Sequence, residues 1–423
     1  MIRIRWRIFA FLFGFGFLAY VQQKSLTVAA EPMMPALGLS QLEIGWLEQA
    51  FVLGYALFQM PGGIFGQHWG ARRTFVVIGT MALFAMTATS VLPALMAGAG
   101  LFTAMLGAQL VLGVSQAAIF PVSAGVFESW FPAHRWAFVQ GLQTMGLQLG
   151  AAVTPPLIAS LMHAFGWQQA LFWATLPGIG LIALWAWYGR DSPREHRGVT
   201  APELAEIGAQ APPVDTRIGL AQILRVLTNR NAALLAFAYL CMNYSFYLLS
   251  NWVFLYLVEE RRFSVLESGW LATAPPLAAA LGAGAGGILT GMLCTRLGDR
   301  WGFRMVPLLA LPAAAALLLA AVYASNPYVA VAVLAACFCC VELTEGAFWG
   351  GAMTVGRGDT MAVSGFMNTG GNMGGIVGIP IVAYLSGHHA WHAAFFVGAG
   401  FAVVSALAWF GIDVARPVLT EAG

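Results

Sequence analysis

Long apolar segments recur along the whole chain, most of them separated by short polar turns. Each run exceeds about 18 residues, the length at which a helix crosses a ~30 Å hydrocarbon core. Because lipid offers no hydrogen bonds, the backbone of such a run must bond within its own helix. With turn residues, charges and Pro/Gly breaks as boundaries, the pattern predicts twelve spans: 8–34, 43–66, 74–96, 100–127, 137–164, 168–189, 230–257, 267–294, 305–323, 328–354, 361–386 and 391–412.

One long polar stretch, 190–229, divides these spans six and six. We expect it to be a cytoplasmic linker that contains a short amphipathic helix near 217–228. The predicted organisation is a six-helix bundle over 1–189, the linker, a second six-helix bundle over 230–412 and a cytoplasmic tail over 413–423.

The arginines predict the orientation in the membrane. If the N-terminus is inside, all arginines but Arg261 and Arg262 fall in cytoplasmic segments, as the positive-inside rule requires. We therefore expect a multi-pass protein of the inner (plasma) membrane with both termini in the cytoplasm.

Composition agrees with a membrane protein and excludes other classes. Hydrophobic residues make up 59% of the chain and charged residues 9%, against about 25% charged in a soluble domain. No basic run favours nucleic acid. No nucleophile–base pair, nucleotide-binding loop or set of metal ligands lies at one depth, so we expect no enzyme, no catalytic residue, no metal and no cofactor.

A cytoplasmic turn occurs twice. Residues 62–73 read "GGIFGQHWGARR" between spans 2 and 3, and residues 295–304 read "TRLGDRWGFR" between spans 8 and 9. Two six-span halves with a repeated turn are typical of a transporter built around a pseudo-two-fold axis, with its substrate site near the midplane between the halves.

The second turn resembles the G-x-L-x-D-R-x-G-R-R loop of the major facilitator superfamily. The resemblance implies an all-α fold of twelve transmembrane helices in two pseudo-symmetric bundles. In that family the loop Asp and Arg residues latch the cytoplasmic side, which implies a latch role for Asp299, Arg300, Arg304, Arg72 and Arg73. Gln67 and His68 stand where Asp and Arg are usual, so we expect a weaker latch in the first half.

Four further stretches resemble the anion:cation symporter branch, which includes sugar-acid, phthalate and sialin-like carriers. They are "AFVLGYALFQMPGG" (50–63), "IFPVSAGVFESWFPAHRWA" (119–137), "NYSFYLLSNWVFLYLVEERRFSVLESGWLA" (243–272) and "SGFMNTGGNMGGIVG" (364–378). They support the branch and do not identify a substrate.

Lys24 is the only lysine of the chain, and it lies deep in span 1. A lysine at the centre of a membrane helix costs about 2.5–3.5 kcal/mol, so it normally faces a water-filled cavity or a partner. It could anchor an anionic substrate. It could also extend to the outer interface or form a fixed ion pair with Glu31, seven residues further along the same helical face.

The residues around Lys24 differ from those of the sugar-acid carriers in the same branch. At the corresponding positions of span 1, sugar-acid carriers usually have the sequence Y-V-D-R-x-N. Their Arg binds the substrate carboxylate, and their Asp takes up and releases protons. This chain has Gln22 and Gln23 at those positions and a cation one residue later, rotated by about 100°. Gln116 of span 4 replaces a Glu that proton-using members carry, so the N-terminal half lacks their proton-coupling pair.

Span 10 supplies two acids, Glu342 and Glu345. Three residues apart, they are expected to share one helical face near the midplane. Burial and mutual repulsion disfavour two negative charges there unless a cation such as Lys24 neutralises one. They could couple protons, gate the transporter, recognise a cation or brace neighbouring helices.

Polar and aromatic positions complete the predicted site. Tyr20, Tyr55, Trp349 and Asn368 match substrate-contacting positions of sugar-acid carriers, and Gln23, Gln116 and Gln148 are further candidates. Ranked lower are Gln143, Tyr244, Tyr247 and Asn251. The glycines of "NTGGNMGG" are expected to allow close helix packing.

These features predict a secondary transporter of a small organic anion, a monocarboxylate or a sugar-acid-like solute, that works by alternating access as a monomer. The expected partners are the organic solute, protons and the lipid bilayer. Alternatives are a carrier of a cationic or zwitterionic solute bound by Glu342 and Glu345, a proton-independent facilitator or exporter, and a membrane solute sensor that transports nothing.

Overall fold

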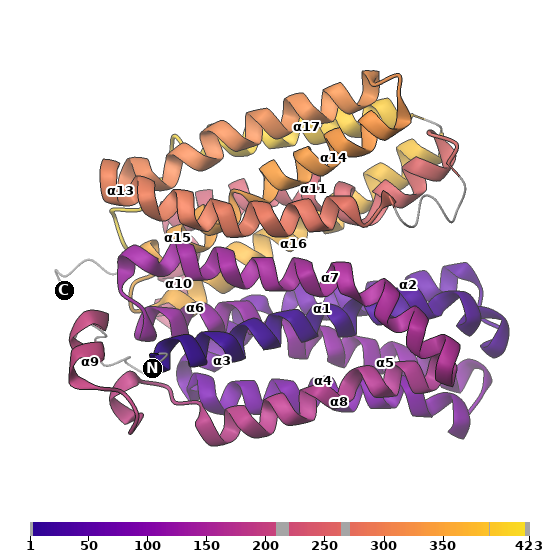
Figure 1. Cartoon of the computed structure of the whole chain (residues 1–423), viewed down its shortest axis with the longest axis horizontal. Coiled ribbons are helices and arrows are strands. Elements are labelled where there is room, and N and C mark those ends of the chain that lie inside the picture. Colours follow the sequence, from indigo (N-terminus) through magenta and orange to yellow (C-terminus); the bar gives the residue numbers. More distant parts are fainter. Residues whose placement is uncertain (1–2, 209–219, 264–270, 389, 419–423) are drawn as a thin grey trace. The chain divides into compact units, whose positions relative to one another are not determined.

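The computed structural model describes residues 3–208, 220–263, 271–388 and 390–418. Within these residues nine helices are long and apolar enough to cross a membrane. The elements are α1 (Ile4–Leu37), α2 (Gln41–Leu57), α3 (Gln59–Trp69), α4 (Ala71–Leu95), α5 (Gly98–Ala117), α6 (Ile119–Trp130), α7 (Trp136–Phe165), α8 (Trp167–Tyr188), α9 (Ala201–Ile207), α10 (Leu220–Thr228), α11 (Arg230–Glu259), α13 (Ala274–Tyr323), α14 (Pro327–Glu342), α15 (Glu345–Val355), α16 (Thr360–Gly387) and α17 (Trp391–Ala408). Figure 1 shows their arrangement within each half of the chain.

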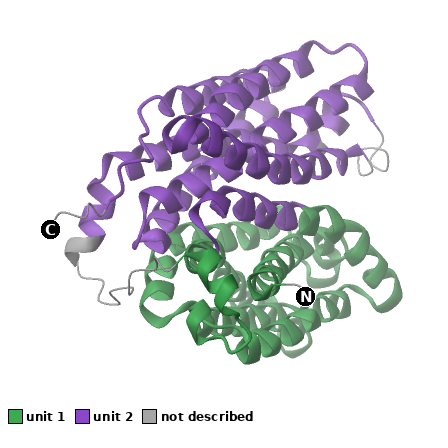
Figure 2. Ribbon diagram, turned by 60° about the vertical axis from the view of Figure 1, so that its left-hand side comes forward, with its two compact units in different colours: residues 1–130, 149–218 green, residues 131–148, 219–423 purple. Residues whose placement is uncertain are grey.

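The chain divides into two compact units (Figure 2). Unit 1 comprises residues 1–130 and 149–218, and unit 2 comprises 131–148 and 219–423. The first part of α7 therefore packs with the helices of the C-terminal half, while its second part packs with the N-terminal half. The helices correspond to the predicted twelve spans, in agreement with the expected fold.

Three predicted spans are interrupted, and two are joined. Span 2 is α2 and α3, which meet at Phe58; span 4 is α5 and α6, which meet at Ala118; span 10 is α14 and α15. Spans 8 and 9 form α13, which turns at Gly298, where φ is +74°. Part of span 8 lies outside the described residues.

Glycines bring several helices into backbone contact. On α16, a Cβ at Gly374 would clash with the Leu240 carbonyl of α11, and one at Gly370 would meet the Ala236 carbonyl. The expected packing role of the "NTGGNMGG" glycines is thus confirmed. In unit 1, a Cβ at Gly113 of α5 would clash with the Phe51 carbonyl of α2.

Replacing Gly113 with alanine is expected to destabilise the protein by about 1–3 kcal/mol, because the new methyl group forces α2 and α5 apart. Gly107→Ala on the same helix meets nothing within 4 Å and should be neutral or stabilising, because alanine favours a helix over glycine by about 1 kcal/mol. The melting temperature of each purified variant measures the difference. Equal effects of the two substitutions would contradict this account of the α2–α5 contact.

The first residues of the linker hold the beginning of α1. Glu203 of α9 accepts the backbone N–H groups of Ile4 and Arg5, at 3.3 and 3.1 Å, and α9 lies beside the N-terminus in Figure 1. Glu206 pairs with Arg3 and Arg5. A helix N-terminus carries unpaired N–H groups and a partial positive charge, which these carboxylates satisfy. The linker sequence did not predict α9, whereas α10 agrees with the expected short helix.

His196 of the same linker segment packs edge-on against Tyr188 at the end of α8, with 4.7 Å between ring centroids. Burial, followed by the charge of Arg190, lowers the pKa of His196. The imidazole is therefore neutral at pH 7, and its Nδ1 accepts the Gly198 N–H at 3.1 Å. These contacts attach residues 190–207 to the helix ends of unit 1.

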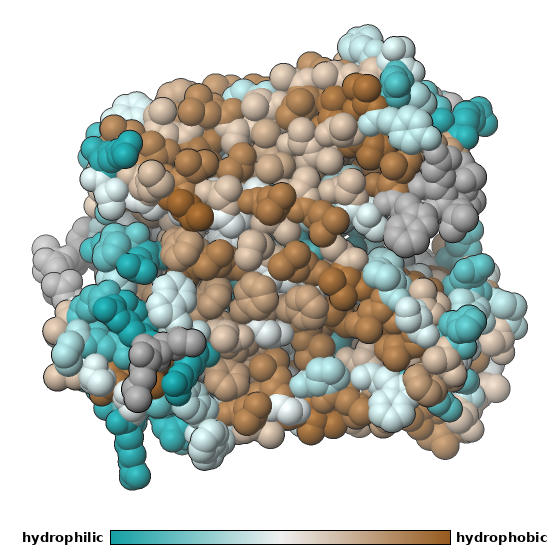
Figure 3. All heavy atoms as spheres, in the orientation of Figure 1, coloured by the Kyte–Doolittle hydropathy of each residue, from teal (hydrophilic) through white to brown (hydrophobic). Residues whose placement is uncertain are grey.

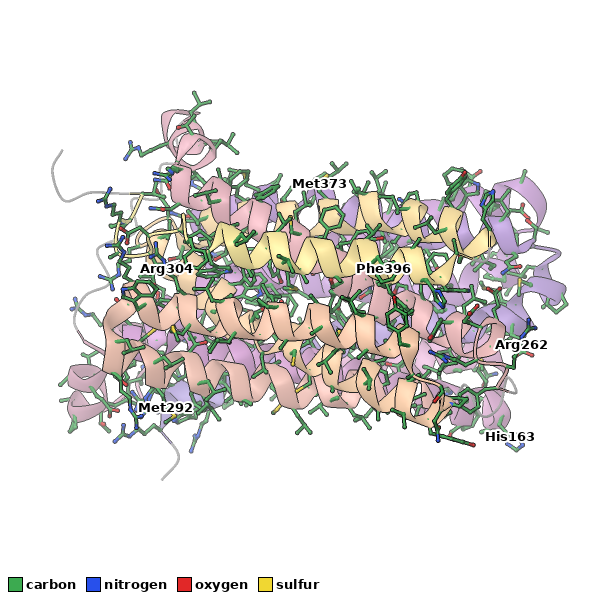
Figure 4. The ribbon with its side chains drawn as sticks, turned by 90° about the horizontal axis from the view of Figure 1, so that it is seen from above. His163, Arg262, Met292, Arg304, Met373 and Phe396 are labelled. Carbon is green, nitrogen blue, oxygen red and sulfur yellow. The ribbon has the colours of Figure 1, made fainter. Side chains whose placement is uncertain are left out.

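Unit 2 carries arginines at both ends of its helices, as Figure 4 shows for Arg304 and Arg262. Neighbouring Arg261 donates to the Ala324 carbonyl at 2.7 Å and to the Ala321 carbonyl at 2.5 Å, at the end of α13. A cation is stabilising at such a C-terminus because the last carbonyls are unpaired. On the face drawn in Figure 3, hydrophobic side chains cover the middle, and hydrophilic ones gather toward the ends.

Candidate functional site

In unit 1, one face of α1 carries the predicted substrate-binding residues. Tyr20, Gln23, Lys24 and Thr27 follow the i, i+3, i+4, i+7 spacing of a single helical face. All four are half-buried or exposed, whereas the residues between them are buried: Val21, Gln22, Ser25 and Leu26. Gln23 and Lys24 thus share the less buried face, so the one-residue shift of the cation keeps it on the predicted side of the helix.

A hydrogen bond joins this face of α1 to α2. Thr27 Oγ1 donates to Glu48 Oε1 at 2.7 Å. Glu48 and Tyr55 lie seven residues apart on one face of α2, and both are half-buried. Tyr55 stacks on Phe51, with 5.7 Å between ring centroids. The structure therefore brings Lys24 and Tyr55 onto two helix faces that meet at Thr27 and Glu48.

Within the described residues of unit 1, Lys24 has no direct partner. Its ammonium makes no hydrogen bond there and no ion pair within 4.0 Å. The charge that acts on it within unit 1 is that of Glu48. A fixed ion pair with Glu31, one of the alternatives that the sequence left open, is absent from the described residues, and Glu31 itself is exposed.

Gln116 lies on the opposite, buried side of α1. Its Nε2 donates to Gln22 Oε1 at 3.2 Å, and both side chains are at most 4% exposed. These are the two positions at which sugar-acid carriers of the resembling branch carry Asp and Glu. In this chain two neutral amides bond to each other there. Gln116 is therefore directed away from the α1 face that carries Lys24.

In unit 2, Glu345 is held by two aromatic donors. Tyr239 OH of α11 donates to both carboxylate oxygens, at 3.0 and 3.2 Å. Trp349 Nε1 donates to Glu345 Oε2 at 2.8 Å. Glu345 begins α15 and is 5% exposed. The indole N–H can only donate, so Glu345 is fixed as an acceptor at the start of a helix.

Glu342 has a different environment. It is the last residue of α14 and is 1% exposed. The Gln148 amide faces its carboxylate, yet neither Gln148 Nε2 nor Glu342 Oε2 has a hydrogen bond of ordinary geometry. Of the two acids, Glu342 has the free acceptor: it can take up a proton or a solute donor without losing a bond.

The helix break between the two acids was not predicted. The sequence predicts one uninterrupted span over 328–354, and this is wrong because α14 ends at Glu342 and α15 begins at Glu345. The charges of both acids nevertheless act on Tyr239 of α11. Thr344 turns the chain: its N–H and its Oγ1 both bond to the Val341 carbonyl, at 3.1 and 2.7 Å. Interrupted helices are typical of transporter binding sites, because they free backbone groups at membrane depth.

Asn368 of α16 is 7% exposed and accepts the Asn372 Nδ2 hydrogen bond through its backbone carbonyl at 2.8 Å. Asn372 Oδ1 in turn accepts from Tyr247 OH of α11, also at 2.8 Å. Helices α11 and α16 thus share a row of polar side chains, and α11 also carries Tyr239, which binds Glu345 of α15.

The predicted latch residues differ in their contacts. Arg304 donates to the Ile412 carbonyl, at 2.9 Å from Nε, and Arg72 donates to the Ala186 carbonyl, at 3.0 Å from Nε. Arg72 therefore binds the last turn of α8, and Arg304 binds the chain just beyond the end of α17. Arg73, Asp299 and Arg300 are exposed.

A carboxylate that the sequence did not single out also reaches the first loop. Asp191 Oδ1 accepts the Arg72 backbone N–H at 2.7 Å, at the first turn of α4. The loop lacks an acid at Gln67, and one is supplied from beyond α8. Nothing in the linear pattern relates Asp191 to Arg72. Glu48, in contrast, could have been recognised from the sequence, because it is a charged residue within predicted span 2, as Lys24 is within span 1.

Comparison with known proteins places the chain in a family. The model of the Major Facilitator Superfamily matches residues 12–358. The chain belongs to this superfamily of transporters and is a multi-pass membrane protein.

Among individual relatives, a probable sulfoacetate transporter of Cupriavidus necator is 28% identical over 87% of this chain and 84% of its own. A hexuronate transporter of Bacillus subtilis is 26% identical over 97% and 95%. A D-galactonate transporter of Escherichia coli is 26% identical over 93% and 91%. The fold is similar to that of the transporter FucP, with a TM-score of 0.73 and 16% identity over 97% of this chain and all of that one.

Proposed function

We propose that the protein is a secondary active transporter that moves a small organic anion, a monocarboxylate or sugar-acid-like solute, across the inner membrane by alternating access. The observation that carries the proposal is Lys24: a membrane-helix ammonium with no direct partner within the described residues of unit 1. An unpaired cation at that depth raises the free energy of the protein. A ligand carboxylate that neutralises the cation removes this cost, which favours binding of the ligand.

The relatives support an anionic solute. Sulfoacetate, hexuronate and D-galactonate, after which those proteins are named, are all organic anions. Tyr20, Gln23 and Tyr55 contribute donors and ring faces on the helices that carry Lys24, as expected of a site for a hydroxylated carboxylate.

Proton coupling is assigned to the acids of unit 2. The neutral Gln22–Gln116 pair cannot titrate, so the N-terminal half has no carboxylate at the positions that such carriers use. Glu342, with its unbonded oxygen, is the proposed proton carrier, and Glu345, held by Tyr239 and Trp349, is the proposed gate beside it. We further propose that the protein works as a monomer with both termini in the cytoplasm.

A second candidate reverses the sign of the solute. Glu342 and Glu345 are two nearly fully buried carboxylates in unit 2, and an unbonded Glu342 oxygen suits the ammonium of a cationic or zwitterionic solute. The relatives favour the anion, and the same uptake experiment separates the two candidates.

The test is uptake into proteoliposomes that contain the purified protein, with an inward proton gradient. Labelled D-galactonate, D-glucuronate and glycolate represent the anions, and choline and glycine betaine represent the alternative. We expect accumulation of at least one monocarboxylate and none of choline. Accumulation of choline or the betaine alone would overturn the anion proposal, and specific binding without uptake would make the protein a sensor.

A further inference from the structure

We propose that Glu48 is a specificity-determining residue of the anion site: it restricts Lys24 to carboxylates that carry a single negative charge and rejects a second anionic group. This inference deepens the proposed function and rests on it.

The geometry places Glu48 beside the site. Its Oε1 accepts the Thr27 hydroxyl of α1 at 2.7 Å, and Thr27 lies one helical turn from Lys24 on the same face. Glu48 is half-buried at the eighth position of α2, about 10 Å along the helix axis from its first residue. A carboxylate in such a position is rare in a membrane helix and indicates a functional role.

The Glu48 carboxylate does not pair directly with the Lys24 ammonium. The two charges interact, but they form no ion pair within 4.0 Å. Thr27 instead holds the Glu48 carboxylate on one side of the α1 face. The ammonium is thereby open to a ligand carboxylate, while a fixed negative charge stands one turn further along α1.

The charges of this arrangement define the ligand class. Lys24 and Glu48 together are neutral, so a monoanion bound at Lys24 leaves a single excess negative charge. A dianion adds a second one, which the fixed charge of the half-buried Glu48 repels. Hydroxyl groups next to the ligand carboxylate, in contrast, can donate to the remaining Glu48 oxygen. The site is therefore suited to a hydroxylated monocarboxylate.

The test measures binding of matched acids to the purified full chain by titration calorimetry. D-galactonate and galactarate share a six-carbon hydroxylated skeleton and differ in whether the far end is an alcohol or a carboxylate. Glycolate and sulfoacetate form a second monoanion–dianion pair. We expect the wild type to prefer the monoanion of the binding pair at least tenfold, and Glu48→Gln to reduce this ratio to about twofold, mainly through tighter binding of the dianion.

Two variants serve as controls. Glu31→Gln removes an exposed carboxylate seven residues from Lys24 on α1 and should leave the ratio unchanged. Glu48→Asp keeps the charge and should retain most of the discrimination, which also answers the objection that Glu48→Gln has misfolded. An unchanged ratio in Glu48→Gln, with binding still dependent on Lys24, would overturn this proposal alone. If no carboxylate of either charge bound the wild type, the proposed function would be overturned as well.

Discussion

Lys24→Met is expected to weaken binding of the transported anion at least 100-fold and to abolish its uptake. The substitution keeps the length of the side chain and removes its charge, so the ligand carboxylate loses its counter-ion in the membrane. Truncating one partner of a buried charge pair costs about 2–5 kcal/mol, and 100-fold corresponds to about 2.7 kcal/mol. Glu48 adds to the loss, since its charge then repels the ligand without compensation.

A thermal-shift titration of the purified variants measures this effect. A ligand at one hundred times its Kd stabilises the wild type by about 2.7 kcal/mol, and Lys24→Met should show no shift at the same concentration. Lys24→Arg keeps the charge and should bind more tightly than Lys24→Met. Wild-type binding by Lys24→Met would show that Lys24 is a structural cation and that the anion site lies elsewhere.

The architecture was predictable because its signal repeats along the chain. Twelve apolar runs, one polar linker and two copies of a turn before Arg72 and Arg304 determine a two-bundle membrane protein with few alternatives. The interruption of span 10 was not predictable, because no proline or glycine stands at Leu343 or Thr344. The turn there depends on side-chain and backbone bonds to the Val341 carbonyl.

The candidate site was predictable residue by residue but not in its pairing. Lys24, Glu342 and Glu345 stand out because charges are rare in membrane helices. The groups that act on two of them come from other helices: the charge of Glu48 of α2 acts on Lys24, and Tyr239 of α11 donates to Glu345. Helical spacing relates neighbours on one helix, whereas contacts between helices depend on how the bundle packs. The contacts between helices therefore become visible only in the packed structure.

The contact between Gln22 and Gln116 changes how the site is understood. Viewed as separate substitutions, each glutamine only removes a titratable group. Bonded at 3.2 Å within unit 1, they form a neutral pair that keeps the two helices in contact without a proton. If the transporter is coupled to protons, the coupling must therefore depend on other acids, and the acids of span 10 are nearly fully buried in unit 2.

Glu342→Gln is therefore expected to abolish proton-driven accumulation while exchange of solute across the membrane persists. With one proton carried per monoanion, each pH unit supplies about 1.36 kcal/mol, so the wild type should concentrate the solute about tenfold per unit. The variant should only equilibrate it. The substitution removes the acid whose Oε2 is unbonded and keeps the size of the side chain, so packing around Gln148 is preserved.

Proteoliposomes allow both readouts on one preparation: accumulation under an imposed pH gradient, and counterflow exchange without one. Glu260→Gln, an exposed acid at the end of α11, is the matched control and should accumulate solute normally. Glu345→Gln should also lose accumulation, with some loss of stability, because one amide oxygen replaces two acceptors for Tyr239 and Trp349. Accumulation that survives in Glu342→Gln and in Glu345→Gln would show that these acids brace the helices of unit 2 and that transport is driven by another ion or by the solute gradient alone.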